Sequence, residues 1–198
     1  MKKISIICPC FNEEKSIAGF MSEVDKHLLG LDYLFEFIFV NDGSSDNTKA
    51  VLTELSEKDS RVRLINLSRN FGKEAALTAG IDRSVGDAVI PIDVDLQDPP
   101  HLIPQMIALW ETGYDVVLAK RTSRDCDSLL KRATAYLYYR THNLVADLKI
   151  PENVGDYRLM SRKVIDAIKL LSENQRFMKG IFAWVGFNTK CIEYERSA

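Results

Sequence analysis

Short apolar runs alternate with amphipathic segments from Ile4 to Ala119, and this alternation limits the folds open to the chain. The runs have the length of strands, and the segments between them carry apolar residues at helical spacing. Such alternation is typical of βαβ units, which form a mainly parallel sheet with helices on both faces. We therefore expect an α/β fold. The predicted strands are Ile4–Cys8, Leu34–Val40, Val62–Leu67, Ala88–Ile92 and Asp115–Ala119, and the predicted helices are Ser16–Leu29, Thr48–Leu55, Glu74–Ser84 and Leu102–Glu111.

The pattern changes after Ala119. A polar loop is followed by a long predicted helix, Ser128–Asp147, which carries basic and tyrosine side chains. The segment Pro151–Ser161 is expected to be a loop or an irregular strand. A helix, Lys163–Leu171, and a final strand, Lys190–Tyr194, complete the prediction.

Size and charge exclude several classes of protein. A chain of 198 residues that is 46% hydrophobic fits one globular domain. Its formal net charge of -2 gives no sign of a nucleic-acid-binding surface. No apolar run approaches the roughly 18 residues needed to cross a bilayer, so we expect a soluble or peripheral chain. The four cysteines and three histidines lack the spacing of a zinc site, and the cysteines are expected to be reduced.

The segment Ala88–Pro100 ends an apolar run in three carboxylates, Asp93, Asp95 and Asp98. Asp93 and Asp95 are two residues apart, so they would point to the same side of an extended chain. Two such carboxylates repel each other unless a cation lies between them. The alternative is that they are solvated turn residues.

Other polar groups also follow predicted strands, namely Asn12 to Glu14, Asp42 and Lys73. Ligands of open α/β sheets bind at the carboxyl ends of the strands. The shared position of these groups therefore favours one site over several independent turns.

Spacing rules out the common nucleotide motifs. The first turn, from Cys8 to Asn12, has no G-x-G-x-x-G pattern, and Gly72-Lys73 lacks the upstream glycine of a phosphate loop. An aspartyl-phosphate phosphatase would carry its D-x-D after the first strand. What remains is a D-x-D that holds a divalent cation, which in turn holds a diphosphate.

Three motifs carry a family resemblance, and they follow one another in order. They are Pro9 to Glu14, Val40 to Thr48 and Asp93 to Pro100. The chain resembles family 2 glycosyltransferases of the GT-A fold, in the subgroup of dolichol-phosphate mannose synthase and the bacterial polyprenyl-phosphate (bactoprenol) glucosyltransferases. Three further segments support the subgroup: Ser68 to Glu74, Gly155 to Met160 and Arg176 to Gly180.

The resemblance implies that residues 1–121 bind the nucleotide sugar. Asp93 and Asp95 would flank Mg²⁺ or Mn²⁺, with Asp95 the more direct ligand and both acting at the donor diphosphate. Lys73 would lie near the nucleotide, and Gln97 would reach the donor sugar. The residues implied for the base and ribose are Pro9, Phe11, Asn12, Glu13 and Asp42.

Residues 122–198, with Arg121 at their border, are implied to bind the acceptor. Arg121 and Arg132 match positions that receive a lipid phosphate, and Arg176 and Lys179 would close over the donor diphosphate. Asp156 matches the acidic residue usually proposed as a catalytic base. A phosphate monoester is already mostly a dianion at pH 7, since its second pKa is about 6. We therefore predict that Asp156 orients a substrate rather than abstracting a proton.

The reaction implied is inverting transfer of a hexose from a nucleotide diphosphate sugar to polyprenyl phosphate at the cytoplasmic face of the plasma membrane. UDP-glucose is the first choice of donor, with GDP-mannose, UDP-galactose and aminosugar donors open. A saccharide acceptor in envelope polysaccharide synthesis is one alternative, and a non-catalytic nucleotide-sugar-binding subunit is another. Relatives commonly continue into membrane helices, so this chain, ending at Ala198, is expected to be part of a longer protein. A homo-oligomer stays open.

Overall fold

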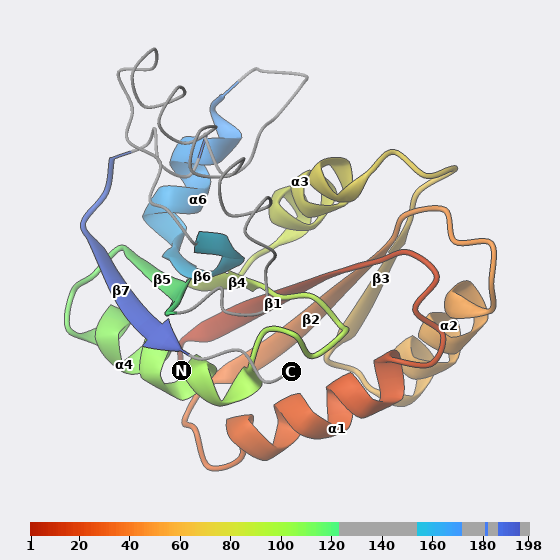
Figure 1. Ribbon diagram of the computed structural model, residues 1–198, viewed down its shortest axis with the longest axis horizontal. Helices are drawn as coiled ribbons and strands as arrows, with labels where there is room; N and C mark the ends of the chain where they lie inside the picture. The colour runs from red at the N-terminus through yellow and green to blue at the C-terminus, as the bar shows by residue number, and fades with distance from the viewer. Residues whose placement is uncertain (123–153, 172–180, 182–185, 195–198) are drawn as a thin grey trace, which may run out of the picture.

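The computed structural model describes residues 1–122, 154–171, 181 and 186–194. Within these residues, seven strands form one sheet in the order β3-β2-β1-β4-β6-β5-β7 (Figure 1). The strands are β1 (Lys3–Cys10), β2 (Leu34–Asn41), β3 (Val62–Asn66), β4 (Ala88–Pro91), β5 (Val116–Arg121), β6 (Val154–Ser161) and β7 (Thr189–Tyr194). The helices are α1 (Ile17–Leu28), α2 (Thr48–Lys58), α3 (Lys73–Arg83), α4 (Ile103–Glu111) and α6 (Arg162–Lys169), with a 3₁₀ turn, η1 (Pro100–Leu102), before α4.

The predicted α/β sheet is confirmed, and it is mainly parallel. Strand β1 pairs in parallel with β2 and β4, β2 pairs in parallel with β3, and β5 pairs in parallel with β7. Strand β6 is the exception, because it runs antiparallel between β4 and β5. Of the two expectations for Pro151–Ser161, the irregular strand is confirmed over Val154–Ser161, since its pairing with β5 shifts register between Leu118 and Lys120. Its polar residues obscured the pattern, although Arg158 in its middle is only 4% exposed.

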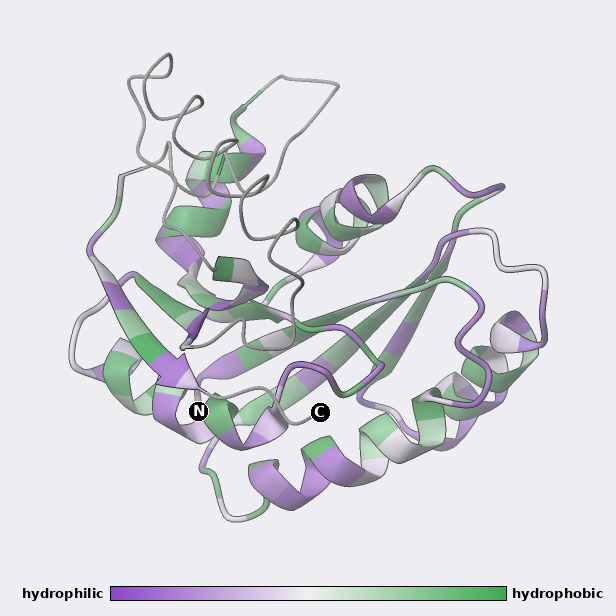
Figure 2. Cartoon of the chain, viewed as in Figure 1, coloured by the Kyte–Doolittle hydropathy of each residue, from purple (hydrophilic) through white to green (hydrophobic). Residues whose placement is uncertain are grey.

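Helices cover both faces of the sheet, as the alternation predicted (Figure 1). On one face, α1 and α4 pack on a core that includes Ile6, Phe39 and Ile90. On the other, α3 and α6 pack on a second core that includes Ile7 and Val89. Neighbouring residues of β1 and β4 therefore serve opposite cores, which explains their continuous apolar runs. Figure 2 shows these central strands as largely hydrophobic.

Helix α3 lies unusually close to the sheet, and Gly80 permits this approach. A Cβ atom on Gly80 would lie 2.4 Å from Cγ2 of Ile7 in β1. A real Cβ contact is never that short, so a side chain here would push the helix away. The close contact holds α3 against β1, and Lys73 is the first residue of this helix.

The order of successive strands reverses at β1, because β2 and β3 lie on one side of it and β4 lies on the other. Open α/β sheets bind ligands at such a switch point. The β1–β4 ladder ends where the Ile92 N–H donates to the Ile7 carbonyl at 2.9 Å. Pro91, which pairs with Ile7 at this end, cannot donate a ladder hydrogen bond. The loop that carries Asp93 and Asp95 follows directly.

Some expectations lie outside the described residues, notably the helix Ser128–Asp147 and Cys126. Within the described part of the chain, none of the helices has the length and apolar character needed to cross a membrane. Cys8, Cys10 and Cys191 are free thiols. Burial raises the pKa of the Cys8 and Cys10 thiols, so these two are poor nucleophiles.

Candidate functional site

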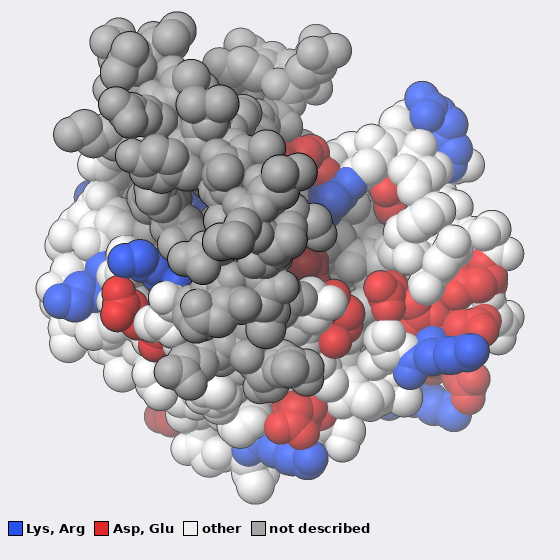
Figure 3. Space-filling model, viewed as in Figure 1, with Lys and Arg blue, Asp and Glu red and all other residues white. Residues whose placement is uncertain are grey.

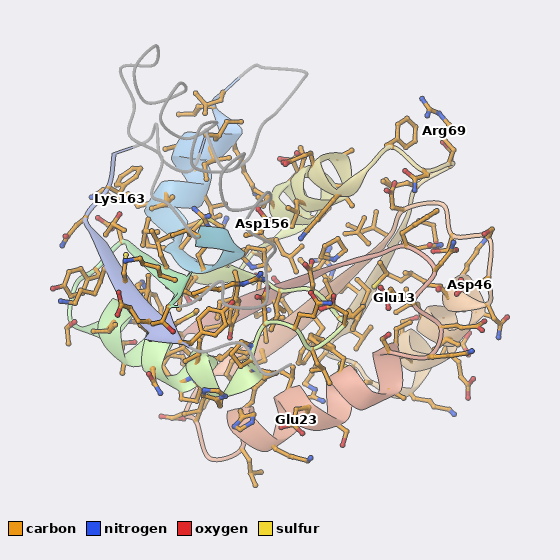
Figure 4. The ribbon with its side chains drawn as sticks, in the orientation of Figure 1. Glu13, Glu23, Asp46, Arg69, Asp156 and Lys163 are labelled. Carbon is orange, nitrogen blue, oxygen red and sulfur yellow. The ribbon has the colours of Figure 1, made fainter. Side chains whose placement is uncertain are left out.

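The loops after β1 and β2 are bound together by side chains that the sequence analysis placed at a nucleotide. The Oδ1 atom of Asn12 accepts the N–H of Ser45 at 2.8 Å, and the Glu13 N–H donates to Oγ1 of Thr48 at 2.8 Å. Asn12 has a φ of 57°, a left-handed conformation that asparagine tolerates better than most residues. Figure 4 shows Glu13 and Asp46 near each other on these loops. The pair of loops forms one rigid wall of the candidate site.

Asp42 joins this wall to the loop before α3. Its two carboxylate oxygens accept the N–H groups of Phe71 at 2.8 Å and Gly72 at 2.9 Å, and the residue is 3% exposed. Between the two loops the backbones nearly touch. A Cβ atom on Gly43 would lie 2.2 Å from the carbonyl carbon of Arg69, and Gly43 has a φ of 63°. Asp42 is expected to contact a nucleobase, and in the structure its carboxylate also positions Gly72, the residue before Lys73.

Lys73 brings together two carboxylates from distant parts of the sequence. Its Nζ atom lies 2.7 Å from Oδ2 of Asp93 and 2.9 Å from Oδ2 of Asp156. Burial lowers the pKa of Lys73, but the two carboxylates outweigh this and hold its pKa above the usual value. The predicted residues Lys73, Asp93 and Asp156 thus form one cluster at the carboxyl ends of β4 and the parallel strands beside it.

The Asp93–Asp95 segment is a turn rather than an extended chain. Strand β4 ends at Pro91, and Asp93 is half-buried while Asp95 is exposed. Oδ1 of Asp95 accepts the N–H of Gln97 at 3.0 Å, and Leu96 between them has a φ of 58°. Left-handed backbone at a leucine is strained, and such strain is concentrated at functional loops. Asp93 therefore faces the cluster, while Asp95 stands at its solvent side.

Asp156 is held by its own strand. The buried guanidinium of Arg158 donates to the carbonyls of Gly155 at 2.6 Å and Asp156 at 3.3 Å. Oδ1 of Asp156 is buried, and among the described residues it has no hydrogen-bond partner. Figure 4 shows Asp156 between β6 and α3. An unpartnered buried carboxylate oxygen costs free energy, so this atom is suited to a substrate or cation ligand.

The carboxylates fit a hard divalent cation. Carboxylate oxygens are the ligands that Mg²⁺ and Mn²⁺ prefer, and the ammonium of Lys73 already places a positive charge between Asp93 and Asp156. No three His, Cys, Asp or Glu side chains of the described residues converge as a metal-binding group. A divalent cation held by only two of these carboxylates would therefore need further oxygen ligands from a diphosphate. Figure 3 shows acidic groups gathered on this face of the molecule.

The remaining predicted residues lie at varying distances from this cluster. Phe11 is 46% exposed on the loop after β1, and Pro9 lies in β1 itself. Arg121, at the end of β5, does not stand free, because it donates to Asp98 and Tyr194. Arg132, Arg176 and Lys179 lie outside the described residues.

Two residues near the site, Asp98 and Tyr194, were not predicted from the sequence to have a functional role. Asp98 was taken as part of a turn, yet it is 5% exposed and accepts hydrogen bonds from Arg121 and Tyr194. Tyr194 was taken only as part of a final strand. The parallel register of β5 and β7 pairs Tyr194 with Arg121, which is 73 residues away in the sequence. No spacing rule reaches that far, so only the pairing reveals the contact.

The comparisons with known proteins agree with this geometry. The family model described as glycosyl transferase family 2 matches residues 5–169, which include most of β1 and all of β4 and β6. This chain belongs to glycosyl transferase family 2.

Relatives of this family 2 chain cover nearly all of it. A bactoprenol glucosyl transferase of Shigella phage SfX is 51% identical over 195 residues, which are 98% of this chain and 64% of that protein. A prophage bactoprenol glucosyl transferase homolog of Escherichia coli K12 is 50% identical over 98% of this chain and 64% of its own length. The family 2 chain therefore spans just under two thirds of these relatives.

Solved structures match the fold of this family 2 chain. Glucosyl-3-phosphoglycerate synthase of Mycobacterium tuberculosis has a TM-score of 0.62 at 21% identity, over 100% of this chain and 72% of that one. A mannosyltransferase of Pyrobaculum calidifontis, solved with GDP-Man and Mn²⁺, has a TM-score of 0.63 at 16% identity, over 97% and 55%. The expected GT-A fold is confirmed.

Proposed function

We propose that this chain is the catalytic part of a glycosyltransferase that moves glucose from UDP-glucose to polyprenyl phosphate at a membrane surface. The meeting of Asp93 and Asp156 at Lys73 carries the proposal, because it joins the predicted donor and acceptor halves at one point. The 51% identity to a bactoprenol glucosyl transferase supports the choice of sugar and acceptor. The cytoplasmic face is the proposed location, because nucleotide sugars are the donors.

The donor half would bind the nucleotide at the loops tied by Asn12 and Asp42. Asp93 and Asp95 would hold a divalent cation, Mg²⁺ or Mn²⁺. When bound, the cation would supply positive charge that stabilises the departing nucleoside diphosphate. Gln97, whose N–H is fixed by Asp95, would present its side chain to the sugar. Arg176 and Lys179, outside the described residues, are proposed to close over the diphosphate.

The acceptor half would present a nucleophile that needs no deprotonation. Polyprenyl phosphate carries a dianion at pH 7, since its second pKa is about 6. Arg121 and Arg132 would bind that dianion. Asp156 would orient a substrate through its Oδ1 atom, because its Oδ2 atom is already paired with Lys73. Inversion at the sugar follows from direct attack on the face opposite the diphosphate.

A transfer assay tests the proposal. Radiolabelled UDP-glucose is incubated with the chain, Mn²⁺ and polyprenyl phosphate, and the products are partitioned into organic solvent. We expect label in the organic phase that depends on the acceptor. Label that appears only with saccharide acceptors would favour the envelope-polysaccharide alternative, and binding without any transfer would favour a non-catalytic subunit.

A further inference from the structure

A closed set of contacts surrounds Asp98, beyond the pair Asp93 and Asp95. Oδ1 of Asp98 accepts hydrogen bonds from the hydroxyl of Tyr194 at 3.0 Å and from Nη2 of Arg121 at 3.3 Å. Nε of Arg121 in turn donates to the Tyr194 hydroxyl at 3.0 Å. Each of the three side chains therefore touches the other two. We call Asp98, Arg121 and Tyr194 the Asp98 triad.

The Asp98 triad fixes one edge of the Arg121 guanidinium and leaves the other open to a ligand. A guanidinium has five N–H donors in a planar fork, and Nε together with one Nη2 donor is used here. The side chain of Arg121 keeps 32% of its exposure, whereas that of Asp98 keeps 8%. The buried carboxylate and hydroxyl thus hold a partly exposed arginine whose remaining donors have no partner among the described residues. A fixed fork loses less entropy when it binds a phosphate.

Hydrogen bonds to backbone carbonyls anchor the triad to three strands. The carbonyl of Tyr194 accepts the Thr122 N–H at 3.0 Å, which ties the end of β7 to the end of β5. The hydroxyl of Tyr157 in β6 donates to the carbonyl of Pro99 at 3.0 Å, which holds the other side of the acidic loop. Tyr157 has no hydrogen bond to Arg121 among the contacts of the described residues. It therefore anchors the loop without fixing the guanidinium.

We infer that Asp98 and Tyr194 are positioning residues that set the Arg121 guanidinium for an acceptor phosphate, and so link the cation-binding loop to the acceptor site. The inference rests on the proposed function, because it takes polyprenyl phosphate as the acceptor. Asp98 belongs to the same short loop as Asp93 and Asp95.

Two conservative tyrosine variants separate positioning from loop anchoring. Tyr194→Phe removes the hydroxyl that contacts Arg121, and Tyr157→Phe removes a hydroxyl that anchors only the loop. Tyr114→Phe is a control in a partly buried tyrosine next to β5. The KM values for polyprenyl phosphate and UDP-glucose are measured for each. We expect Tyr194→Phe to raise the acceptor KM about tenfold, the loss of one hydrogen bond to a charged group, with the donor KM within about twofold.

The outcomes distinguish the inference from the proposed function. An unchanged acceptor KM in Tyr194→Phe, or an equal rise in Tyr157→Phe, overturns the inference when the wild-type chain is active. If the wild-type chain makes no lipid-linked glucose, the proposed function fails instead. Hydrogen exchange of the Arg121 Nε–H, measured by NMR and assigned with Arg121→Lys, then decides the positioning. Faster exchange in Tyr194→Phe alone supports the triad, and unchanged exchange overturns it.

Discussion

The ammonium of Lys73, the first residue of α3, lies 2.9 Å from Oδ2 of Asp156 in β6. The two residues are far apart in sequence and meet because β6 enters the sheet beside β4. The Oδ2 atom of Asp156 is already occupied by the ammonium of Lys73. The contact therefore favours an orienting role for Asp156 over proton abstraction.

Replacing Asp156 by Asn tests this role. We expect Asp156→Asn to lower kcat roughly 100-fold, the size of loss that follows misplacement of a reacting group, without changing the pH dependence. Rates are compared across pH values with UDP-glucose and polyprenyl phosphate. Asp166→Asn, at an exposed carboxylate of α6, is the control. Recovery of Asp156→Asn at high pH would instead indicate that the wild-type residue acts as a base.

Lys73 and a divalent cation are expected to compete for the same carboxylates, and removing the ammonium tests this. In Lys73→Met, Asp93 and Asp156 face each other without a positive charge, so we expect the unfolding free energy without metal to fall by about 1 kcal/mol, or about 2–4 °C in Tm. Added Mn²⁺ should then raise the Tm of Lys73→Met more than that of the wild type. Lys49→Met, on exposed α2, is the control. Equal Mn²⁺ responses in all three proteins would contradict the prediction.

Asp95 is predicted to be needed for metal-dependent donor binding. Its carboxylate is exposed at the solvent side of the cluster and keeps free oxygen lone pairs for a cation. We expect Asp95→Ala to abolish the Mn²⁺-dependent part of UDP-glucose binding in calorimetry. Asp32→Ala, before β2 at the far end of the sheet, should bind like the wild type. Unchanged binding by Asp95→Ala would remove this carboxylate from the donor site.

Gly43 should tolerate no side chain. Its positive φ and the 2.2 Å approach of the Arg69 backbone predict that Gly43→Ala lowers the unfolding free energy by about 2–4 kcal/mol. Gly19→Ala is the matched control, since a Cβ atom there meets nothing within 4 Å in helix α1, and we expect a small gain in stability. Urea unfolding of both variants checks the prediction. A loss in Gly43→Ala no larger than the effect at Gly19 would contradict it.

Glu36 should make stability depend on pH. Burial raises the pKa of Glu36, but hydrogen bonds from Ser5 and the Val85 N–H, together with the Arg63 charge, outweigh it and hold its pKa below the usual value. A lowered pKa in the folded state adds stability above the unfolded pKa of about 4.3, and this contribution is lost as pH falls through the folded value.

We therefore expect Glu36→Gln to lower the unfolding free energy by about 1–2 kcal/mol at pH 7. The difference from the wild type should shrink as pH falls below about 4. Urea unfolding at several pH values measures this. Glu57→Gln, at an exposed residue of α2, should match the wild type at every pH. A difference for Glu36→Gln that persists at low pH would show that shape, not charge, sets the effect.

Local patterns predicted the parts of the structure that depend on neighbouring residues. Strands β1 to β5 and helices α1 to α4 follow from apolar spacing, and polar residues after the strands predicted where the cluster lies. Lys73, Asp93 and Asp156 were each named from the sequence. Their mutual contact was not, because it depends on which strand lies beside β4.

Long-range pairing accounts for what was missed. Strand β6 carries Asp156 and Arg158 in a segment whose pattern left a loop or an irregular strand open, since a buried arginine breaks the apolar pattern. From the sequence alone, Asp98 is a turn residue. Its contact with Tyr194 depends on the pairing of β7 with β5. Asp95 lies in a turn, one of the two alternatives left open by the sequence, because β4 ends at Pro91. These features are set by the fold as a whole.

The position of β6 in the sheet affects the order in which the strands pair during synthesis. During synthesis, β1 to β4 can pair as they emerge, but β5 has no described neighbour except β6 and β7, which come later. Until the ribosome has passed Ser161, the edge of β4 is open to other chains. The carboxylate of Asp156 joins the cluster at the same moment that this edge is covered. The pairing of β6 with β4 thus covers this edge and brings Asp156 to Lys73 and Asp93.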